Sequence, residues 1–161
     1  MAKKLALLAM FGVAMAHLEG VVVVYLRGVL EVAQSASGTA TVDALTRRYL
    51  WIEQTREAAT IVMLVSLALA VGRTWRERAV AFLWTFAFWD LFYYASLYLL
   101  LRWPPALTTL DVLFLIPVPW VAPVWVPIGI STLTILGIAV LARIRAGRAD
   151  RLSPTPEGRS V

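Results

Sequence analysis

Four long apolar segments, separated by shorter polar stretches, make up most of the chain. Their positions predict helices over residues of about 5–32, 49–71, 79–101 and 121–142. A helix rises about 1.5 Å per residue, so about 20 apolar residues cross the roughly 30 Å hydrocarbon core of a bilayer. Each segment meets this length. The pattern therefore predicts an all-α integral membrane protein, a four-helix bundle that forms a single transmembrane domain over residues 1–142.

The three breaks between these segments differ in composition. Residues 34–48 are mostly small and polar, and they predict a loop. Residues 72–78 predict a short loop with three arginines and one glutamate. The third helix is expected to end before Pro104 and Pro105, because successive prolines cannot continue a helix.

The segment 103–120 is the least regular part of the chain. Thr108 and Asp111 have the spacing of a helix cap and an acidic first turn, so we expect a short re-entrant or interfacial helix followed by extended, proline-rich chain. Non-helical backbone at membrane depth has to be buried in protein or line a cavity. We therefore expect this segment to form a lid over the bundle. The residues assigned to the lid are Asp111, Pro117, Pro119 and Trp120.

Basic residues gather at one end of the predicted helices. Lys3 and Lys4 precede the first helix, the loop 72–78 follows the second, and five arginines lie in the tail 143–161. Lysine and arginine concentrate on the cytoplasmic side of membrane proteins. We expect the bacterial inner membrane as the location, with both termini cytoplasmic and a disordered basic tail. The net charge of +5 is explained in this way, so the expected partners include membrane lipids and no nucleic acid.

The N-terminal segment also has features of a signal peptide. Its apolar run reaches Ala16 in an Ala-x-Ala pattern, which imitates a cleavage site. Cleavage there would leave His17 as a new N-terminus, able in principle to chelate copper. The apolar run continues beyond His17 to Leu26, so we expect an uncleaved membrane helix.

The composition limits the possible cofactors. The chain has no cysteine, which excludes disulfides, thiolate metal sites and iron–sulfur clusters. It has one histidine, His17, whereas a haem between helices normally takes two such ligands. Haem is therefore not expected.

Three carboxylates fall inside predicted membrane helices, where ionisable groups are costly and point to function. Measured from the basic end at about 1.5 Å per residue, Glu19 and Glu57 lie at about 21–22 Å and Asp90 at about 16 Å. All three come from different helices. We expect them to meet in the outer half of the bundle, with His17, at about 18 Å, as a further candidate ligand.

Helical spacing identifies side chains that would orient these carboxylates. Residues three or four positions apart share a face of a helix, which places Glu53 beside Glu57 and both Tyr93 and Tyr94 beside Asp90. The residues expected to orient the carboxylates or pair with them are Arg27, Glu53, Arg56, Tyr93 and Tyr94.

Other helix faces are expected to serve packing. Glu19 lies on a stripe with Gly12 and Ala16, small residues that let membrane helices approach closely. The fourth predicted helix carries no charged residue, and we expect it to act as scaffold, with Ser131 an ordinary membrane-helix residue.

The charges in the membrane do not balance. Glu19, Glu57 and Asp90 bring three negative charges, and Arg56 brings one positive charge at similar depth. Either some carboxyls are protonated or a cation lies among them. Carboxylates with one imidazole suit iron, manganese or zinc, so the predicted metal ligands are Glu19, Glu57, Asp90 and His17. The Glu-x-x-His pairs of di-metal bundles are absent from the sequence.

Two functions are consistent with this pattern. The first is a carboxylate-rich site for a metal ion or another cation, with redox or proton-coupled activity. A redox metal would make an oxidoreductase for a lipid-soluble substrate such as a quinone. The second is a non-catalytic subunit or assembly factor of a larger membrane complex, with ion pairs such as Glu53 or Glu57 to Arg27. Its partners would be other membrane subunits or further copies of the chain. No residue is assigned a catalytic role.

Several short motifs occur together in the chain. They are Glu19 with Val24-Tyr25-Leu26-Arg27, Arg56-Glu57-Ala58-Ala59-Thr60, Trp89-Asp90 with Tyr93-Tyr94, Trp103-Pro104, and Asp111 with the run from Leu113 to Trp120. In these motifs the chain resembles a family of bacterial four-helix integral membrane proteins. No activity is established for that family, so the resemblance implies no function. It singles out Glu19, Glu57, Asp90 and Asp111.

Overall fold

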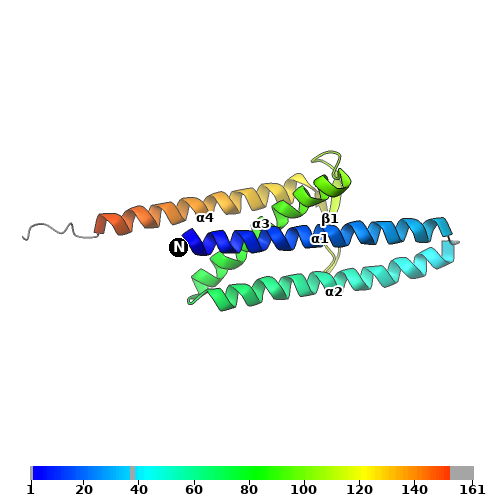
Figure 1. Ribbon diagram of the computed structural model, residues 1–161, viewed down its shortest axis with the longest axis horizontal. Coiled ribbons are helices and arrows are strands. Elements are labelled where there is room, and N and C mark those ends of the chain that lie inside the picture. The colour runs from blue at the N-terminus through cyan, green and yellow to red at the C-terminus, as the bar shows by residue number, and fades with distance from the viewer. Residues whose placement is uncertain (1, 37–38, 153–161) are drawn as a thin grey trace, which may run out of the picture.

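The computed structural model describes residues 2–36 and 39–152. It consists of four long helices and one short antiparallel hairpin (Figure 1). The elements are α1 (Ala2–Ala36), α2 (Thr39–Val71), α3 (Trp75–Leu101), β1 (Leu110–Phe114), β2 (Trp120–Pro123) and α4 (Trp125–Leu152).

Each of the four helices contains a stretch long and apolar enough to cross a membrane. These stretches are Ala2–Val29, Tyr49–Val71, Trp75–Leu101 and Trp125–Arg145. Large apolar side chains on their outer faces are exposed in the isolated chain, as expected for helices that contact lipid. The predicted bundle of four membrane-type helices is confirmed.

Helix α3 is the centre of the bundle, because it packs against α1, α2 and α4. It crosses behind α1 in Figure 1, so that its first turns lie beside α2 and its last turns beside α4. Its beginning is fixed by Thr74, whose Oγ1 accepts a hydrogen bond from the Glu77 amide (3.2 Å), while Glu77 accepts one from the Arg73 amide (2.9 Å). This is a variant of the capping box. It ends at Arg102, which adopts a left-handed conformation (φ 53°) ahead of the two prolines.

Three small residues bring α1 against α3. Gly12, Ala16 and Gly20 are four residues apart and share one face of α1, and all three are buried. A Cβ placed on Gly12 would lie 2.7 Å from the carbonyl oxygen of Thr85, and one on Gly20 would lie 3.0 Å from the Cβ of Ser96. The close approach predicted from Gly12 and Ala16 is therefore confirmed, and Gly20 extends it.

The segment between α3 and α4 differs from the predicted short helix. It forms a two-stranded antiparallel hairpin in which Leu110 pairs with Pro123 and Val112 with Val121. At its base, the Val124 amide donates a hydrogen bond to the carbonyl oxygen of Thr109 (3.0 Å). The expected helix fails because β-branched and aromatic residues favour extended chain, while Pro117 and Pro119 exclude a helix between the strands.

The helix bounds differ from those that the sequence pattern indicated. All four helices are longer, and α3 begins at Trp75, within the predicted loop 72–78. Helix α4 begins at Trp125 and not at the predicted residue 121, because Trp120–Pro123 forms β2. The residues predicted as a loop at 34–48 are helical except for 37–38, which lie outside the described part of the chain. The predicted basic tail is helical up to Leu152, and residues 153–161 also lie outside the described part. The polar stretches beside the apolar segments were interpreted as loops. A helix that leaves the membrane needs no apolar residues, and alanine, leucine and arginine are strong helix formers.

The contact between α1 and α3 predicts a position-dependent effect of adding one methyl group. Gly12→Ala should lower the free energy of unfolding by about 1–3 kcal/mol, because its Cβ has no room beside the Thr85 backbone. Gly28→Ala, on the same helix, should have no destabilising effect, since nothing lies within 4 Å of its Cβ. Reversible unfolding in mixed micelles, followed by circular dichroism, measures both. Equal losses for the two variants would contradict the packing described.

Candidate functional site

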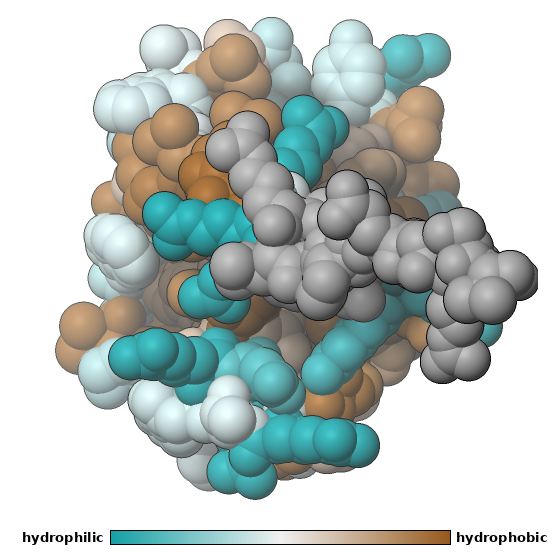
Figure 2. Space-filling model, turned by 90° about the vertical axis from the view of Figure 1, so that its left-hand side faces the viewer, coloured by the Kyte–Doolittle hydropathy of each residue, from teal (hydrophilic) through white to brown (hydrophobic). Residues whose placement is uncertain are grey.

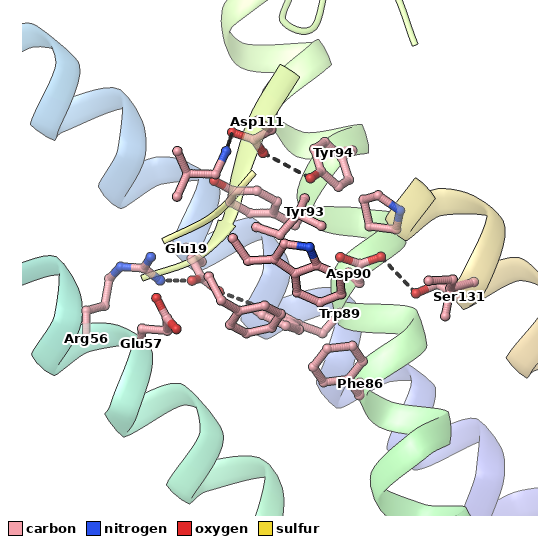
Figure 3. Close-up of a pocket in the computed structure, with 16 residues that line it drawn as sticks. Glu19, Arg56, Glu57, Phe86, Trp89, Asp90, Tyr93, Tyr94, Asp111 and Ser131 are labelled. Atoms are coloured by element: carbon pink, nitrogen blue, oxygen red, sulfur yellow. Dashed lines mark hydrogen bonds and ion pairs between the residues drawn. The ribbon is translucent and has the colours of Figure 1, made fainter. Parts of the chain in front are cut away.

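Most of the predicted site residues surround one cavity of about 210 Å³. The cavity lies between α1, α2, α3, the hairpin and the first turns of α4 (Figure 3). Its lining residues are Glu19, Arg56, Glu57, Phe86, Trp89, Asp90, Tyr93, Tyr94, Asp111, Val112, Leu113, Phe114, Trp120, Pro127, Ile130 and Ser131. The structure thus brings Glu19, Glu57 and Asp90 together, as expected from their depth along three helices.

An ion-pair network crosses one side of the cavity. Arg56 of α2 forms a salt bridge with the buried Glu19 of α1, and its Nε donates to Glu53 Oε2 at 2.5 Å. The second oxygen of Glu19 accepts a hydrogen bond from the indole of Trp89 (2.5 Å). Both oxygens of Glu19 therefore have a partner, one on α2 and one on α3. The sequence had suggested Arg27 as an ion-pair partner of Glu53 or Glu57, and the described partner of Glu53 is Arg56 instead.

Glu57 binds backbone amides of the hairpin rather than a charged side chain. It is buried, and its two oxygens accept hydrogen bonds from the amides of Leu115 (2.8 Å) and Ile116 (3.3 Å). These amides lie in the turn between β1 and β2, where no strand partner is available for them. The carboxylate therefore supplies the acceptors that irregular backbone at this depth requires.

Asp90 faces the cavity from α3 and is bound on the other side by α4. The hydroxyl of Ser131 donates to Asp90 Oδ2 at 2.8 Å, and both side chains line the cavity (Figure 3). The prediction that α4 is only scaffold is wrong in this respect, because it contributes Ser131 to the site. Among the described residues, no salt bridge reaches Asp90.

Asp111 reaches the cavity from β1. Tyr94 donates to its Oδ2 (2.9 Å), and the amide of Val112 donates to its Oδ1 (2.9 Å). Burial raises the pKa of the Asp111 carboxyl above its ordinary value, although both hydrogen bonds act in the opposite direction. The guanidinium of Arg27 lies 5.0 Å above the ring of Trp103, a cation–π contact near the same end of the bundle.

Aromatic rings form the apolar wall of the cavity. Phe86 of α3 stacks on Phe114 of the hairpin with ring centroids 6.2 Å apart, and it meets Trp89 edge-on at 5.1 Å. Tyr93 and Tyr94 meet at 5.4 Å. Both tyrosines line the cavity together with Asp90, but the described hydrogen bond of Tyr94 goes to Asp111.

His17 lies apart from the other predicted metal ligands. It is exposed, does not line the cavity, and has its Nδ1 3.4 Å from the hydroxyl of Ser96. It points away from Glu19 because two residues of a helix span about 200°. Within the part of the chain that the structure describes, no group of three His, Cys, Asp or Glu side chains is placed to hold a metal ion.

The sequence analysis assigned no role in the site to several side chains that contribute to it. Trp89 and Ser131 are hydrogen-bond donors to Glu19 and Asp90, and Phe86 and Phe114 close the wall. Trp89 and Phe86 lie one and four residues before Asp90, so helical spacing offered a signal for Phe86. Nothing in the apolar sequence of α4 marks Ser131 over Thr132 or Thr134.

Comparisons with protein-family models, with curated proteins and with solved structures find no match to this chain.

The Glu19–Arg56 pair is suited to a double-mutant cycle. Arg56→Gln should destabilise the protein by about 3 kcal/mol, because it leaves the Glu19 carboxylate buried without a cation. Glu19→Gln should cost a similar amount. The double variant should be clearly more stable than the sum of the two losses implies. Unfolding in mixed micelles measures all four proteins, and additive losses would show that the two groups act independently.

The bonds from Glu57 predict local protection of the hairpin turn. Glu57→Ala should speed hydrogen exchange at the amides of Leu115 and Ile116 by about ten- to a hundredfold, the range expected for losing a hydrogen bond to a charged group. Glu57→Gln keeps one carbonyl oxygen and should protect one amide. Glu53→Ala is the matched control on the same helix face and should leave both amides unchanged. Unchanged exchange in Glu57→Ala would contradict the contact.

Proposed function

We propose that the chain is an integral membrane protein that binds a small organic cation, such as a protonated amine, in the cavity beside Asp90. The observation that carries this proposal is the charge of the lining. Four carboxylates line the cavity against one guanidinium, that of Arg56. Arg56 is already engaged by Glu19 and Glu53, so it supplies no positive charge to Asp90.

The hydrogen bonds and ion pairs of the carboxylates support Asp90 as the binding group. Asp111, on the hairpin, already accepts hydrogen bonds from Tyr94 and from the Val112 amide, one at each oxygen. Glu19 has an ion pair, and Glu57 accepts two backbone hydrogen bonds. Asp90 has the Ser131 hydroxyl as its hydrogen-bond donor, and that hydroxyl brings no charge. A carboxylate in a poorly solvated site is stabilised either by a proton or by a cation. A ligand that carries its own positive charge would complete this site.

The shape and the walls favour an organic cation over a bare metal ion. Aromatic faces attract cations and also contact methyl and methylene groups. Six aromatic residues line the cavity: Phe86, Trp89, Tyr93, Tyr94, Phe114 and Trp120. A volume of about 210 Å³ has room for about seven non-hydrogen atoms if each takes the roughly 30 Å³ of a water molecule. The metal site predicted from Glu19, Glu57, Asp90 and His17 stays a prediction.

The expected membrane orientation gives the cavity a position. Basic residues at the opposite end support a cytoplasmic placement for both termini in the bacterial inner membrane. The cavity would then lie in the outer half of the bundle, with the hairpin as its lid. Exposed Trp120 and Ile130 belong to its lining, so a ligand would enter between the hairpin and α4.

A titration with amines of different charge tests the proposal. Butylammonium and tetramethylammonium should stabilise the detergent-purified protein against thermal unfolding, whereas butanol, a neutral analogue of butylammonium, should not. Asp90→Asn should weaken amine binding by at least about 30-fold, since it removes one partner of the charge pair. Asp43→Asn, on α2 outside the membrane-type stretch, is the control of equal charge. No stabilisation by either amine, or equal effects of the two variants, would refute the proposal.

The ion pairs also support a second candidate function. Glu19, Arg56 and Glu53 join α1 to α2 without any ligand, as expected for a non-catalytic subunit or assembly factor whose charges only hold helices together. In that case Asp90→Asn would leave the protein folded, amines would have no effect, and other membrane subunits would co-purify. Stabilisation by Mn²⁺ or Zn²⁺ that depends on Asp90 would instead support the metal site.

A further inference from the structure

A second hollow lies at the opposite end of the bundle from the cavity. It has a volume of about 1160 Å³ and is formed by the first turns of α1 and α3, the α2–α3 link and the late part of α4. Figure 1 shows that α3 crosses the bundle and begins beside the end of α2. Its lining residues are Lys4, Leu5, Leu8, Val71, Arg73, Thr74, Trp75, Arg76, Glu77, Val80, Ala81 and Arg145.

The hollow has an apolar inner wall and a basic rim. Leu8 and Ala81 of the inner wall belong to the buried core of the bundle, and Leu5 and Val80 pack against that core. Four cationic side chains and one carboxylate, that of Glu77, line the hollow. Figure 2 views this end and shows hydrophilic side chains interspersed with apolar ones. The net positive rim and the apolar wall together match a molecule with an anionic head and a hydrocarbon tail.

Two of the rim cations have no partner within the described chain. Lys4 donates its Nζ hydrogen to the carbonyl of Val71 (2.6 Å), and so caps the end of α2. Glu77 lies near Lys4 and Arg73 and acts electrostatically on both. Arg76 and Arg145, by contrast, have no hydrogen bond or ion pair with any residue that the structure describes. Guanidinium groups bind phosphate by paired hydrogen bonds, so these two are free to do so.

We propose that this hollow binds an anionic phospholipid of the surrounding leaflet, with its phosphate between Arg76 and Arg145 and an acyl chain along Leu5, Leu8 and Val80. The size favours a lipid, because about 1160 Å³ exceeds the roughly 1,000 Å³ upper range of pockets for drug-sized ligands. The exposed Trp75, 78% accessible, lies at the rim, where a tryptophan favours the membrane interface. Basic pockets between membrane helices are suited to acidic head groups.

Native mass spectrometry of the full chain in a neutral detergent tests this proposal. Phosphatidylglycerol and phosphatidylcholine with identical acyl chains are titrated separately, and the affinity of the first bound lipid is compared. Phosphatidylglycerol should bind at least about fivefold more tightly, and Arg76→Gln and Arg145→Gln should each reduce its affinity by about fivefold. The detergent has no charged bilayer surface, so general attraction to a leaflet does not contribute.

Arg143→Gln is the matched control for charge. Arg143 is exposed on α4, two positions before Arg145, and does not line the hollow. Its substitution should leave phosphatidylglycerol binding unchanged. Equal affinities for the two lipids, or equal losses in Arg143→Gln and Arg145→Gln, would overturn the proposal. Full displacement of the lipid by millimolar inorganic phosphate would also overturn it, because the site would then take a soluble anion.

Discussion

The close contact between α1 and α3 is the constraint on which the rest of this structure depends. Gly12, Ala16 and Gly20 allow the two backbones to approach, and Glu19, between Ala16 and Gly20, thereby comes within hydrogen-bond distance of Trp89. Glu19 then fixes Arg56, and with it the face of α2 that carries Glu57. Glu57 in turn fixes the hairpin. The position of the hairpin, almost a hundred residues further along the chain, thus depends on the close packing of α1 through three successive polar contacts.

The carboxylates inside the bundle are satisfied here by partners from other elements, as expected of helices apolar enough to cross a hydrocarbon core, where no water is available. Glu19 has partners on α2 and α3, Glu57 on the hairpin and Asp90 on α4. The carboxylates therefore connect the helices and the hairpin to one another, and they also line the cavity. Among these three helix carboxylates, Asp90 differs because its described partner is a hydroxyl, which brings no charge and no backbone amide.

The helices, the small-residue contact and the carboxylate layer were predictable from the sequence, because each depends on local periodicity. Glu19, Glu57 and Asp90 could be placed at similar depth from the helix rise alone. Rotation about each helix axis was not predictable. It sends His17 away from the cavity and brings Ser131 to it. The hairpin was missed because the spacing of Thr108 and Asp111 fits a helix cap, while pairing across a turn depends on Glu57, over fifty residues earlier. The C-terminal ends of α1 and α4 and the beginnings of α2 and α3 were missed because a polar stretch marks the limit of the apolar segment, not of the helix.

The distribution of the ion pair over two helices has a consequence for biosynthesis. Helices are synthesised in chain order, so α1 emerges with the Glu19 carboxyl before its cation exists. A lone carboxylate at the centre of a helix costs about 2.5–3.5 kcal/mol on insertion, whereas the paired group is compensated. For helices that cross a bilayer, this difference favours release of α1 and α2 into lipid together, as one helical hairpin. Trp89 belongs to α3, which is synthesised after α1 and α2. Its hydrogen bond to Glu19 can therefore form only after α3 has joined the first two helices.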